Sequence, residues 1–350
     1  MRKTSEKSGR KGGKSAPVNE ADDGLLAYRA KRDPAATNEP FAVDARGGGK
    51  TLNGRFVVHQ HAATRMHYDV RIQIGNALRS FAVPRGPSLD PADKRLAVHV
   101  EDHPLEYLDF EDVIPEGNYG AGAMIAWDTG RVTYLEGSAE EGLARGKIDL
   151  ALSGFKLKGR FGLIKTKRDP SEWLLVKKQD EFCEVGVDLI ERAPRSVYSG
   201  LTVSELYRAR EVVAEHEAVA RSMGAVEREL DVSGREPMLC STDGCDLDDP
   251  ARLYELKLDG VRIVAEKHGQ RVNLRYRNGR PATLNYPEIA RAVRALPAER
   301  IVLDGEIVAF DPAGKPSFLR ILPRIQARRP LDVERVREQV PVVYLVFDLL

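Results

Sequence analysis

Short runs of alternating polar and apolar residues between positions 55 and 180 constrain the fold of this 350-residue chain more than any other feature. Successive side chains of a strand point to opposite faces, so such runs are typical of half-buried strands. Many short strands separated by turn residues indicate an antiparallel barrel or sandwich. The predicted strands are 56–61, 67–74, 79–83, 96–100, 123–128, 131–134, 147–152, 154–158, 162–165 and 173–177, with hairpin turns at 128–130 and 153–154.

The same alternation gathers reactive side chains on one face of these strands. His67, Asp69 and Arg71 share a face, and the same spacing groups His59 with His61 and, in a strand extended over 96–103, His99 with Glu101 and His103. Neutral imidazole and carboxylate suit a divalent transition metal such as Mn or Zn, and arginine suits a phosphate. A single histidine would more often be a hydrogen-bonded core residue, but this group favours a metal-assisted phosphoester site.

Composition limits the classes of protein that this chain can belong to. The net charge is +1, so any binding to nucleic acid has to come from local basic patches. No apolar run reaches the length of a membrane span, and the basic N-terminus lacks the apolar segment of a secretory signal. Three cysteines give no disulfide framework, and the spacing of Cys240 and Cys245 without a second pair disfavours a zinc knuckle.

Changes in composition divide the chain into four parts. Residues 1–24 resemble a disordered basic tail, 25–180 form the β domain, 181–235 form a linker with one long helix, and 236–350 form an α+β domain. A capping-box spacing at 202–205 begins the linker helix. In the last part we predict strands at 253–258, 261–267, 272–277, 301–310 and 342–349 and a helix at 286–296. The chain stops on a predicted strand, which favours a C-terminally truncated domain.

Residues 56–122 resemble the 3′-phosphoesterase domain of bacterial DNA ligase D. The resemblance rests on HAATRMHYDVR at 61–71, FAVPRGPSLD at 81–90, KRLAV at 94–98, EDHPLEY at 101–107 and IPEGNYGAG at 114–122, with KRD at 31–33 and TNEP at 37–40 upstream. It implies that His61, His67 and Asp69 bind Mn²⁺. It also implies catalytic roles for Arg71 and His103, and phosphate or substrate contacts for Arg95, Tyr107, Glu39, Asp33 and Arg85. His59 stands where the family often carries glutamine.

Residues 254–262, YELKLDGVR, resemble the K-x-D-G-x-R motif of ATP-dependent DNA ligases, which have an ATP-grasp-like nucleotidyltransferase domain. YRNG at 276–279, LDGEI at 303–307 and FDLL at 347–350 follow in the family's order. The resemblance implies that Lys257 attacks ATP and forms a lysyl-AMP intermediate, for which its amine must lose a proton. The implied ATP-binding residues are Glu255, Arg262, Arg277, Glu306 and Phe347.

The two resemblances imply a cytoplasmic, nucleoid-associated bacterial enzyme of non-homologous end joining. Its first domain would use Mn²⁺ to remove a 3′-ribonucleoside and a 3′-phosphate, and its second would use ATP with Mg²⁺ or Mn²⁺. DNA ends, nicked duplex DNA and a Ku-like protein would be its partners. Because the family's later motifs are absent, we expect poor nick sealing by this chain alone. Two alternatives stay open: a non-catalytic module that binds DNA ends or a Ku-like partner, and an RNA ligase or capping-type second domain.

Overall fold

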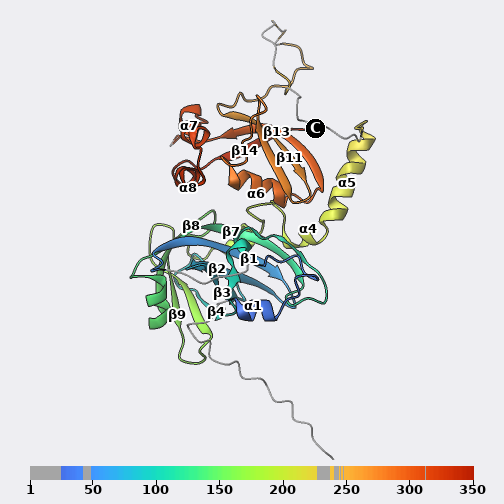
Figure 1. Cartoon of the computed structure of the whole chain (residues 1–350). Coiled ribbons are helices and arrows are strands. Elements are labelled where there is room, and N and C mark those ends of the chain that lie inside the picture. Colours follow the sequence, from blue (N-terminus) through green and yellow to red (C-terminus); the bar gives the residue numbers. More distant parts are fainter. Residues whose placement is uncertain are drawn as a thin grey trace, which may run out of the picture.

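The computed structural model describes residues 25–41, 49–226, 237–239, 244, 246, 248–311 and 313–350. The predicted tail and the Cys240 and Cys245 pair lie outside these ranges. Two β-sheet bodies follow one another along the chain (Figure 1). Among the described residues, no helix has both the length and the apolar character needed to cross a bilayer.

The first body is a closed antiparallel barrel, the first of the two architectures, barrel or sandwich, that the sequence predicted. Eight strands follow the order β1-β2-β3-β4-β10-β9-β8-β7, and β7 pairs back to β1. Their bounds are β1 Asn53–Ala62, β2 Met66–Ile74, β3 Ala77–Val83, β4 Lys94–His99, β7 Gly122–Tyr134, β8 Lys147–Gly154, β9 Lys158–Lys165 and β10 Glu172–Lys177. The short strands β5 (His103–Pro104) and β6 (Asp112–Ile114) pair with β3 and β7. Closure removes the free edges that a flat sheet would expose.

Both faces of the barrel wall are buried near β1. Val58 points into the main core with Val70 and Trp127, whereas Val57 belongs to a second cluster with Tyr28 and Tyr107. Helix α1 (Leu26–Ala30) and the 3₁₀ helix η1 (Leu105–Asp109) contribute Tyr28 and Tyr107 to this outer cluster. The polar residues of β1 and β2 that share the outer face are therefore sheltered from water.

The predicted hairpin turn at 128–130 is wrong, because β7 runs through it without a break. Asp128 is fully buried and accepts hydrogen bonds from the amides of residues 155, 156 and 157. At Gly130 a side chain would collide with the backbone of Ser153. Asp128 and Gly130 are thus required for close contacts between strands. Local sequence alone does not show whether such residues form a turn or a close contact.

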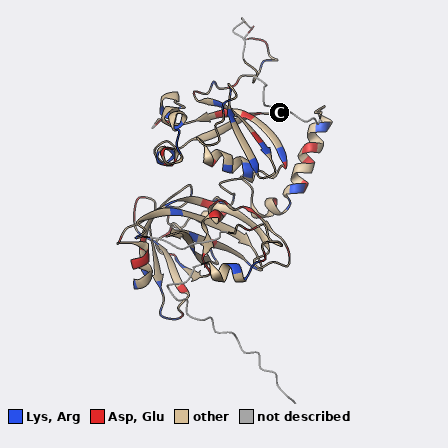
Figure 2. Cartoon of the chain, viewed as in Figure 1, with Lys and Arg blue, Asp and Glu red and all other residues tan. Residues whose placement is uncertain are grey.

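The linker holds two helices in place of the one long helix that we predicted. Beyond α3 (Leu189–Arg192), α4 (Val203–Tyr207) and α5 (Ala209–Ser222) are separated at Arg208. Val203 and Leu206 pack on Ala123 and Ile125 of the barrel, whereas α5 has no buried residue. The helix breaks where packing on the barrel ends, and α5 then rises away from it (Figure 1). Figure 2 shows its charges of both signs.

The second body is an α+β domain, as predicted. Its antiparallel sheet has the order β12-β11-β13-β14. The bounds are β11 Val261–His268, β12 Arg271–Tyr276, β13 Arg300–Val308 and β14 Val343–Leu349, with helices α6 Pro287–Ala295, α7 Phe318–Gln326 and α8 Pro330–Gln339. We predicted α6 but neither α7 nor α8, nor α2 (Ala139–Arg145) in the first domain. Pro323 inside α7 obscures its helical pattern, whereas Pro330 at the start of α8 is a helix-start signal that we did not use.

The predicted strand at 253–258 is also wrong. Residues 252–259 carry no strand or helix assignment, and Leu253 and Leu256 are almost fully exposed. No described strand pairs with this segment, so its alternating apolar residues have no surface to cover.

Candidate metal and phosphate site

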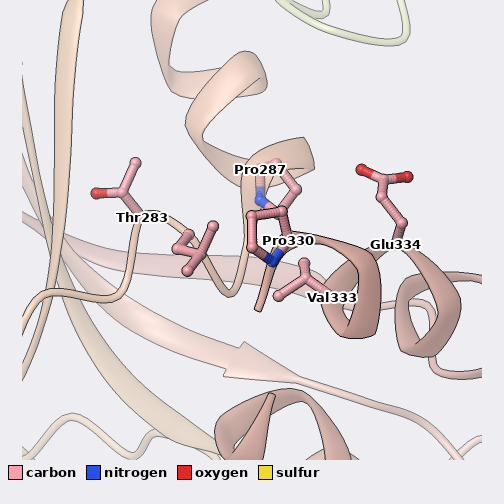
Figure 3. A pocket seen from close by; sticks show the side chains of 6 residues that line it. Thr283, Pro287, Pro330, Val333 and Glu334 are labelled. Atoms are coloured by element: carbon pink, nitrogen blue, oxygen red, sulfur yellow. The ribbon is translucent and has the colours of Figure 1, made fainter. Parts of the chain in front are cut away.

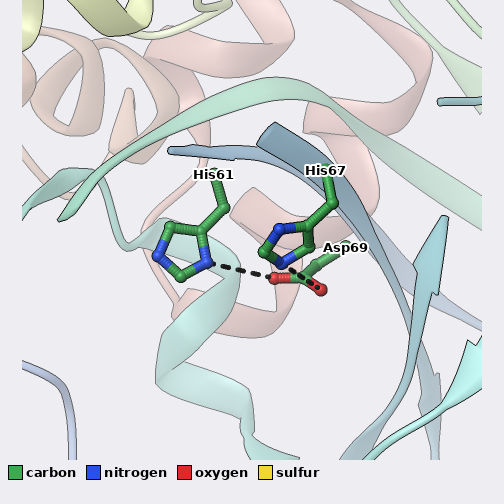
Figure 4. A group of neighbouring side chains, drawn as sticks. All are labelled: His61, His67 and Asp69. Atoms are coloured by element: carbon green, nitrogen blue, oxygen red, sulfur yellow. Dashed lines mark ion pairs between the residues drawn. The ribbon is translucent and has the colours of Figure 1, made fainter. Parts of the chain in front are cut away.

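Three potential metal ligands converge on the outer face of β1 and β2. His61 and His67 are Cα partners across these strands, and Asp69 lies two residues further along β2. One ligand atom from each of the three lies within 4.8 Å of the other two. Asp69 Oδ2 is 3.7 Å from His61 Nδ1, and Asp69 Oδ1 is 3.5 Å from His67 Nε2 (Figure 4). Two imidazoles and one carboxylate form a donor set that suits Mn, Fe or Zn.

Backbone carbonyls fix the orientation of both imidazoles. His61 Nε2 donates to the Gly120 carbonyl at 2.8 Å, and His67 Nδ1 donates to the Arg65 carbonyl at 2.9 Å. A carbonyl can only accept, so the proton sits on these nitrogens and the lone pairs of His61 Nδ1 and His67 Nε2 face Asp69. Metal-binding histidines are oriented in this way by a hydrogen bond on the other ring nitrogen. The residues therefore fit a divalent cation.

Arg71 lies beside the metal ligands and is almost completely buried. Its Nη1 contacts Asp69 Oδ2 at 3.0 Å and His59 Nδ1 at 3.2 Å, and its Nη2 contacts His103 Nε2 at 3.2 Å. Its Nε is buried and has no hydrogen-bond partner among the described residues. A buried guanidinium with a free N–H is suited to an incoming anion such as a phosphate.

Burial sets the charge of the groups around Arg71. Burial, reinforced by the Arg71 cation, lowers the pKa of both His59 and His103 well below the usual value, so both rings are neutral at pH 7. Burial alone would raise the pKa of Asp69, but Arg71 and the two imidazoles outweigh it and hold that pKa well below its usual range. When His67 takes up a second proton, on Nε2, that N–H faces Asp69, and this hydrogen bond raises the pKa of His67. A metal ion would compete with that proton for the ring nitrogen.

The segment before the barrel closes over this site. Glu39 is buried, accepts a hydrogen bond from the Tyr107 hydroxyl, and pairs with Arg32 Nε at 2.7 Å. Arg32 Nη1 also lies 3.3 Å from Glu101 Oε1. Glu39 and Tyr107 thus lie in one buried network, and their contacts with phosphate or substrate stay predictions. Arg32 was not among the predicted site residues, although it belongs to the KRD motif.

His103 reaches the site by a path that the sequence did not reveal. We expected one strand over 96–103, but β4 ends at His99, and His103 in β5 pairs with Leu78 of β3. Ser80 on β3 adds a hydroxyl 3.1 Å from His103 Nδ1. Ser80 was missed because its link to His103 depends on the pairing of distant strands. His99 instead packs against Phe81 and Arg79, away from the metal ligands.

Two candidate ATP-binding residues of the second domain line an open pocket of about 300 Å³. Glu255 and Phe347 both line it, together with Leu256, Leu258, Leu345 and Val346. Lys257 lies on the same exposed segment, and its charge acts on Glu306 of β13, whose pKa burial raises. The guanidinium of Arg262 makes two contacts with Asp304, at 3.0 and 2.7 Å, and lies 5.4 Å from the Phe347 ring. Arg277 lies exposed on the turn after β12.

A second pocket, of about 260 Å³, lies between the N-terminal ends of α6 and α8 (Figure 3). Its lining residues are Thr283, Leu284, Pro287, Pro330, Val333 and Glu334. They include no cation, so this pocket does not suit a triphosphate.

Comparison with known proteins matches each of the two domains to a protein family. The family model described as the DNA ligase D 3′-phosphoesterase domain matches residues 59–165, and the ATP-dependent DNA ligase domain matches residues 237–350. The multifunctional non-homologous end joining protein LigD of Pseudomonas aeruginosa is 37% identical over 93% of this chain and 38% of its own length. The chain belongs to the DNA ligase D family. It combines a 3′-phosphoesterase domain with an ATP-dependent DNA ligase domain.

Other members of the DNA ligase D family show the same extent of similarity. The LigD proteins of Mycolicibacterium smegmatis and Mycobacterium tuberculosis are 33% and 32% identical over 88% and 85% of this chain, which cover 34% and 33% of their own lengths. The crystallised ligase domain of M. tuberculosis LigD is 35% identical over 27% of this chain and 28% of its own, with a TM-score of 0.22. The chain spans about a third of the length of these curated relatives.

The structure does not bring every residue implied by the DNA ligase D resemblance to the metal ligands. Arg95 pairs across β4 with Leu175, on the face of the sheet opposite to Asp69, and contacts Asp93 at 2.7 Å. Asp33 accepts from the amide of residue 35 in an exposed turn, and Arg85 lies exposed on the turn after β3. Substrate roles for these three residues stay predictions.

Proposed function

We propose that the barrel domain is a divalent-metal-dependent 3′-phosphoesterase that removes a 3′-ribonucleoside and a 3′-phosphate from DNA ends. The convergence of His61, His67 and Asp69, with both imidazoles oriented by backbone carbonyls, is the observation that supports this most directly. These residues would hold the metal, with Mn²⁺ as our expected ion. The bound cation would polarise a phosphoryl oxygen and acidify a water.

The remaining residues have distinct tasks in this proposal. Arg71 would bind the phosphate through its free Nε while keeping Asp69 ionised. His103, which is neutral and holds its own proton on Nδ1 toward the Glu101 carbonyl, would present the lone pair of Nε2 to the site. That nitrogen would accept a proton from the attacking water and pass it on to the leaving oxygen. Tyr107 and Glu39 would support this face from behind, since the tyrosine hydroxyl already donates to Glu39.

The test uses a primer–template with a 3′-phosphate, in Mn²⁺ or in EDTA. We expect Mn²⁺-dependent conversion to a 3′-hydroxyl, lost in His67→Ala and retained in His216→Ala, a control at a histidine of α5 outside the site. Calorimetry should show that the His67→Ala protein binds Mn²⁺ more weakly. If folded wild-type protein converts nothing, the alternative of a module that only binds DNA ends or a Ku-like protein is preferred.

For the second domain we infer ATP-dependent adenylylation at Lys257 with Mg²⁺ or Mn²⁺. The family match over residues 237–350 and the placement of Glu255 and Phe347 on one pocket support this inference. Incubation with α-labelled ATP should label the wild-type chain and a Lys315→Arg control but not Lys257→Arg. Labelling that persists in Lys257→Arg contradicts the assignment. Nicked DNA and DNA ends are the proposed substrates, and end joining in the bacterial cytoplasm is the proposed process.

A further inference from the structure

An exposed aromatic side chain lies next to the candidate metal site. Tyr119 belongs to the loop between β6 and β7 and is 50% exposed. The next residue, Gly120, provides the carbonyl that orients His61, at 2.8 Å from its Nε2. Tyr119 therefore directly precedes the residue whose carbonyl contacts the candidate metal ligand His61.

The loop that carries Tyr119 is held in place on several sides. Asn118 Nδ2 donates to the carbonyls of Ala36 and Pro115, at 3.0 and 3.2 Å. Gly120 has a φ of +76°, and a side chain there would contact the His61 ring. The backbone near Tyr119 is thus fixed relative to the metal ligands, so its ring can serve as a positioned surface.

Two cations lie against the Tyr119 ring. Lys31 Nζ is 4.6 Å from the ring centroid and 3.3 Å from the hydroxyl, and the Arg32 guanidinium is 5.3 Å from the centroid. One explanation is that the ring only anchors these cations by cation–π contact. That explanation does not require the ring to stay half exposed. An exposed aromatic ring with neighbouring cations is the arrangement that binds a base and its phosphate in single-stranded nucleic acid.

We propose that Tyr119 is a stacking surface for the base of the 3′-terminal nucleotide, with the exposed Lys31 beside the adjoining phosphate, whereas Arg32 is buried against Glu39 and Glu101 behind the ring. This rests on the proposed phosphoesterase function and adds a positioning residue to it. Stacking accepts every base, so it would place any 3′ end at the metal without selecting a sequence.

The experiment measures binding of labelled primer–templates to metal-free protein, where no turnover occurs. Both primers end in a 3′-phosphate, and the last nucleotide carries either a base or an abasic sugar. We expect Tyr119→Ala to weaken binding of the base-bearing end by roughly 5- to 150-fold, with a change of less than about twofold for the abasic end. Tyr119→Phe, which keeps the ring, and Tyr207→Ala, a control at an exposed tyrosine of α4, should bind both ends like the wild type.

Two results would overturn the proposal. Equal weakening of both ends in Tyr119→Ala would mean that the ring only anchors Lys31 and Arg32, and unchanged binding would mean that the ring does not contact the DNA. Failure of the proposed function would show separately, as wild-type protein that binds the base-bearing end but releases no phosphate when Mn²⁺ is added.

Discussion

At the scale of single residues, His59 determines how the buried arginine of the site is held. Its Nε2 donates to the Phe110 carbonyl at 3.0 Å, and its Nδ1 accepts from Arg71 Nη1 at 3.2 Å. The ring is fully buried and neutral, so it can accept that hydrogen bond. His59 is thus a positioning residue for Arg71, whose Nη1 also contacts the metal-ligand candidate Asp69.

This role predicts a difference between two substitutions of His59. A glutamine amide can also donate to one neighbour and accept from another, so His59→Gln should keep phosphate release within about threefold of wild type. His59→Ala removes the hydrogen bonds to both the Phe110 carbonyl and Arg71. It should slow phosphate release by roughly 10- to 100-fold, the range seen for supporting residues of metal sites. Initial rates at saturating Mn²⁺ measure both effects. A His59→Gln protein as slow as His59→Ala would contradict this role.

At the scale of secondary-structure elements, the junction of β6 and β7 depends on glycine. Gly122 begins β7 with a φ of +136°, and a side chain there would collide with the Ala62 carbonyl of β1. Gly117, in the same loop, also has a positive φ, +86°, but open space around it. Both positions have a backbone conformation that is unfavourable for residues other than glycine. Only position 122 is also closely packed against another strand.

We therefore expect unequal losses of stability when alanine replaces these glycines. Gly117→Ala should lower the free energy of unfolding by about 1 kcal/mol, the cost of a positive φ. Gly122→Ala should cost about 1–3 kcal/mol more, because the strands must move apart. Denaturant unfolding of the two variants beside wild type measures the difference. Equal losses would show that the conformation alone, and not the contact with β1, requires glycine at position 122.

Lys156 connects the loop between β8 and β9 to the linker. Its Nζ donates to the carbonyls of Ala193 and Arg195, at 2.9 and 2.5 Å, and lies 4.4 Å from the Trp127 ring centroid. Burial lowers the pKa of Lys156 from 10.5 to about 8. Between these values the unfolded chain keeps a proton that the folded chain releases, so this residue makes stability rise with pH in that interval.

The pH dependence can be isolated with a Lys156→Met variant. Between pH 8 and 10.5 the free energy of unfolding of wild type should rise relative to the variant. We expect on the order of 1–2 kcal/mol, since solvent screens the partly exposed ammonium. Denaturant titrations across this range measure the difference, with Lys158→Met reporting the general effect of removing a lysine from this region. A constant difference between wild type and Lys156→Met would contradict the prediction.

At the scale of the whole molecule, an ion pair between described residues joins the two domains. Arg291 of α6 lies 2.6 Å from Asp109 Oδ1 at the end of η1, and its guanidinium is 5.5 Å from the Tyr198 ring centroid. Arg55 of the barrel contacts the same carboxylate at 3.2 Å. The Arg291 side chain is only 11% exposed, so the pair is largely sheltered by the domain contact. Figure 1 shows α6 on the side of the second sheet that faces the barrel.

This contact predicts that Arg291→Asp will separate the domains. Two carboxylates would then face each other, at a cost between the ~1 kcal/mol of exposed pairs and the ~3–5 kcal/mol of buried ones. Small-angle X-ray scattering should show a larger radius of gyration for Arg291→Asp than for wild type or Arg294→Asp, a control on the same helix. Adding Asp109→Arg should restore the compact form. A double variant as extended as Arg291→Asp would contradict this pairing.

The sequence alone determined those features that depend on local periodicity. A strand has a fixed period of two, so His67, Asp69 and Arg71 had to share one face wherever their strand was placed. The number and spacing of short strands likewise indicated a barrel or sandwich. The domain boundaries that we predicted at 24, 180 and 235 are not decided by this periodicity and stay predictions.

Only the tertiary structure decided which faces meet. Pairing of β1 with β2 in one register brings His61 opposite His67, and pairing of β5 with β3 carries His103 to Arg71. Pairing of β4 with β3 and β10 directs Arg95 to the opposite face, and the segment that holds Lys257 remains outside the second sheet. Register depends on hydrogen bonds and packing between residues far apart in the chain, which the pattern within one strand cannot specify.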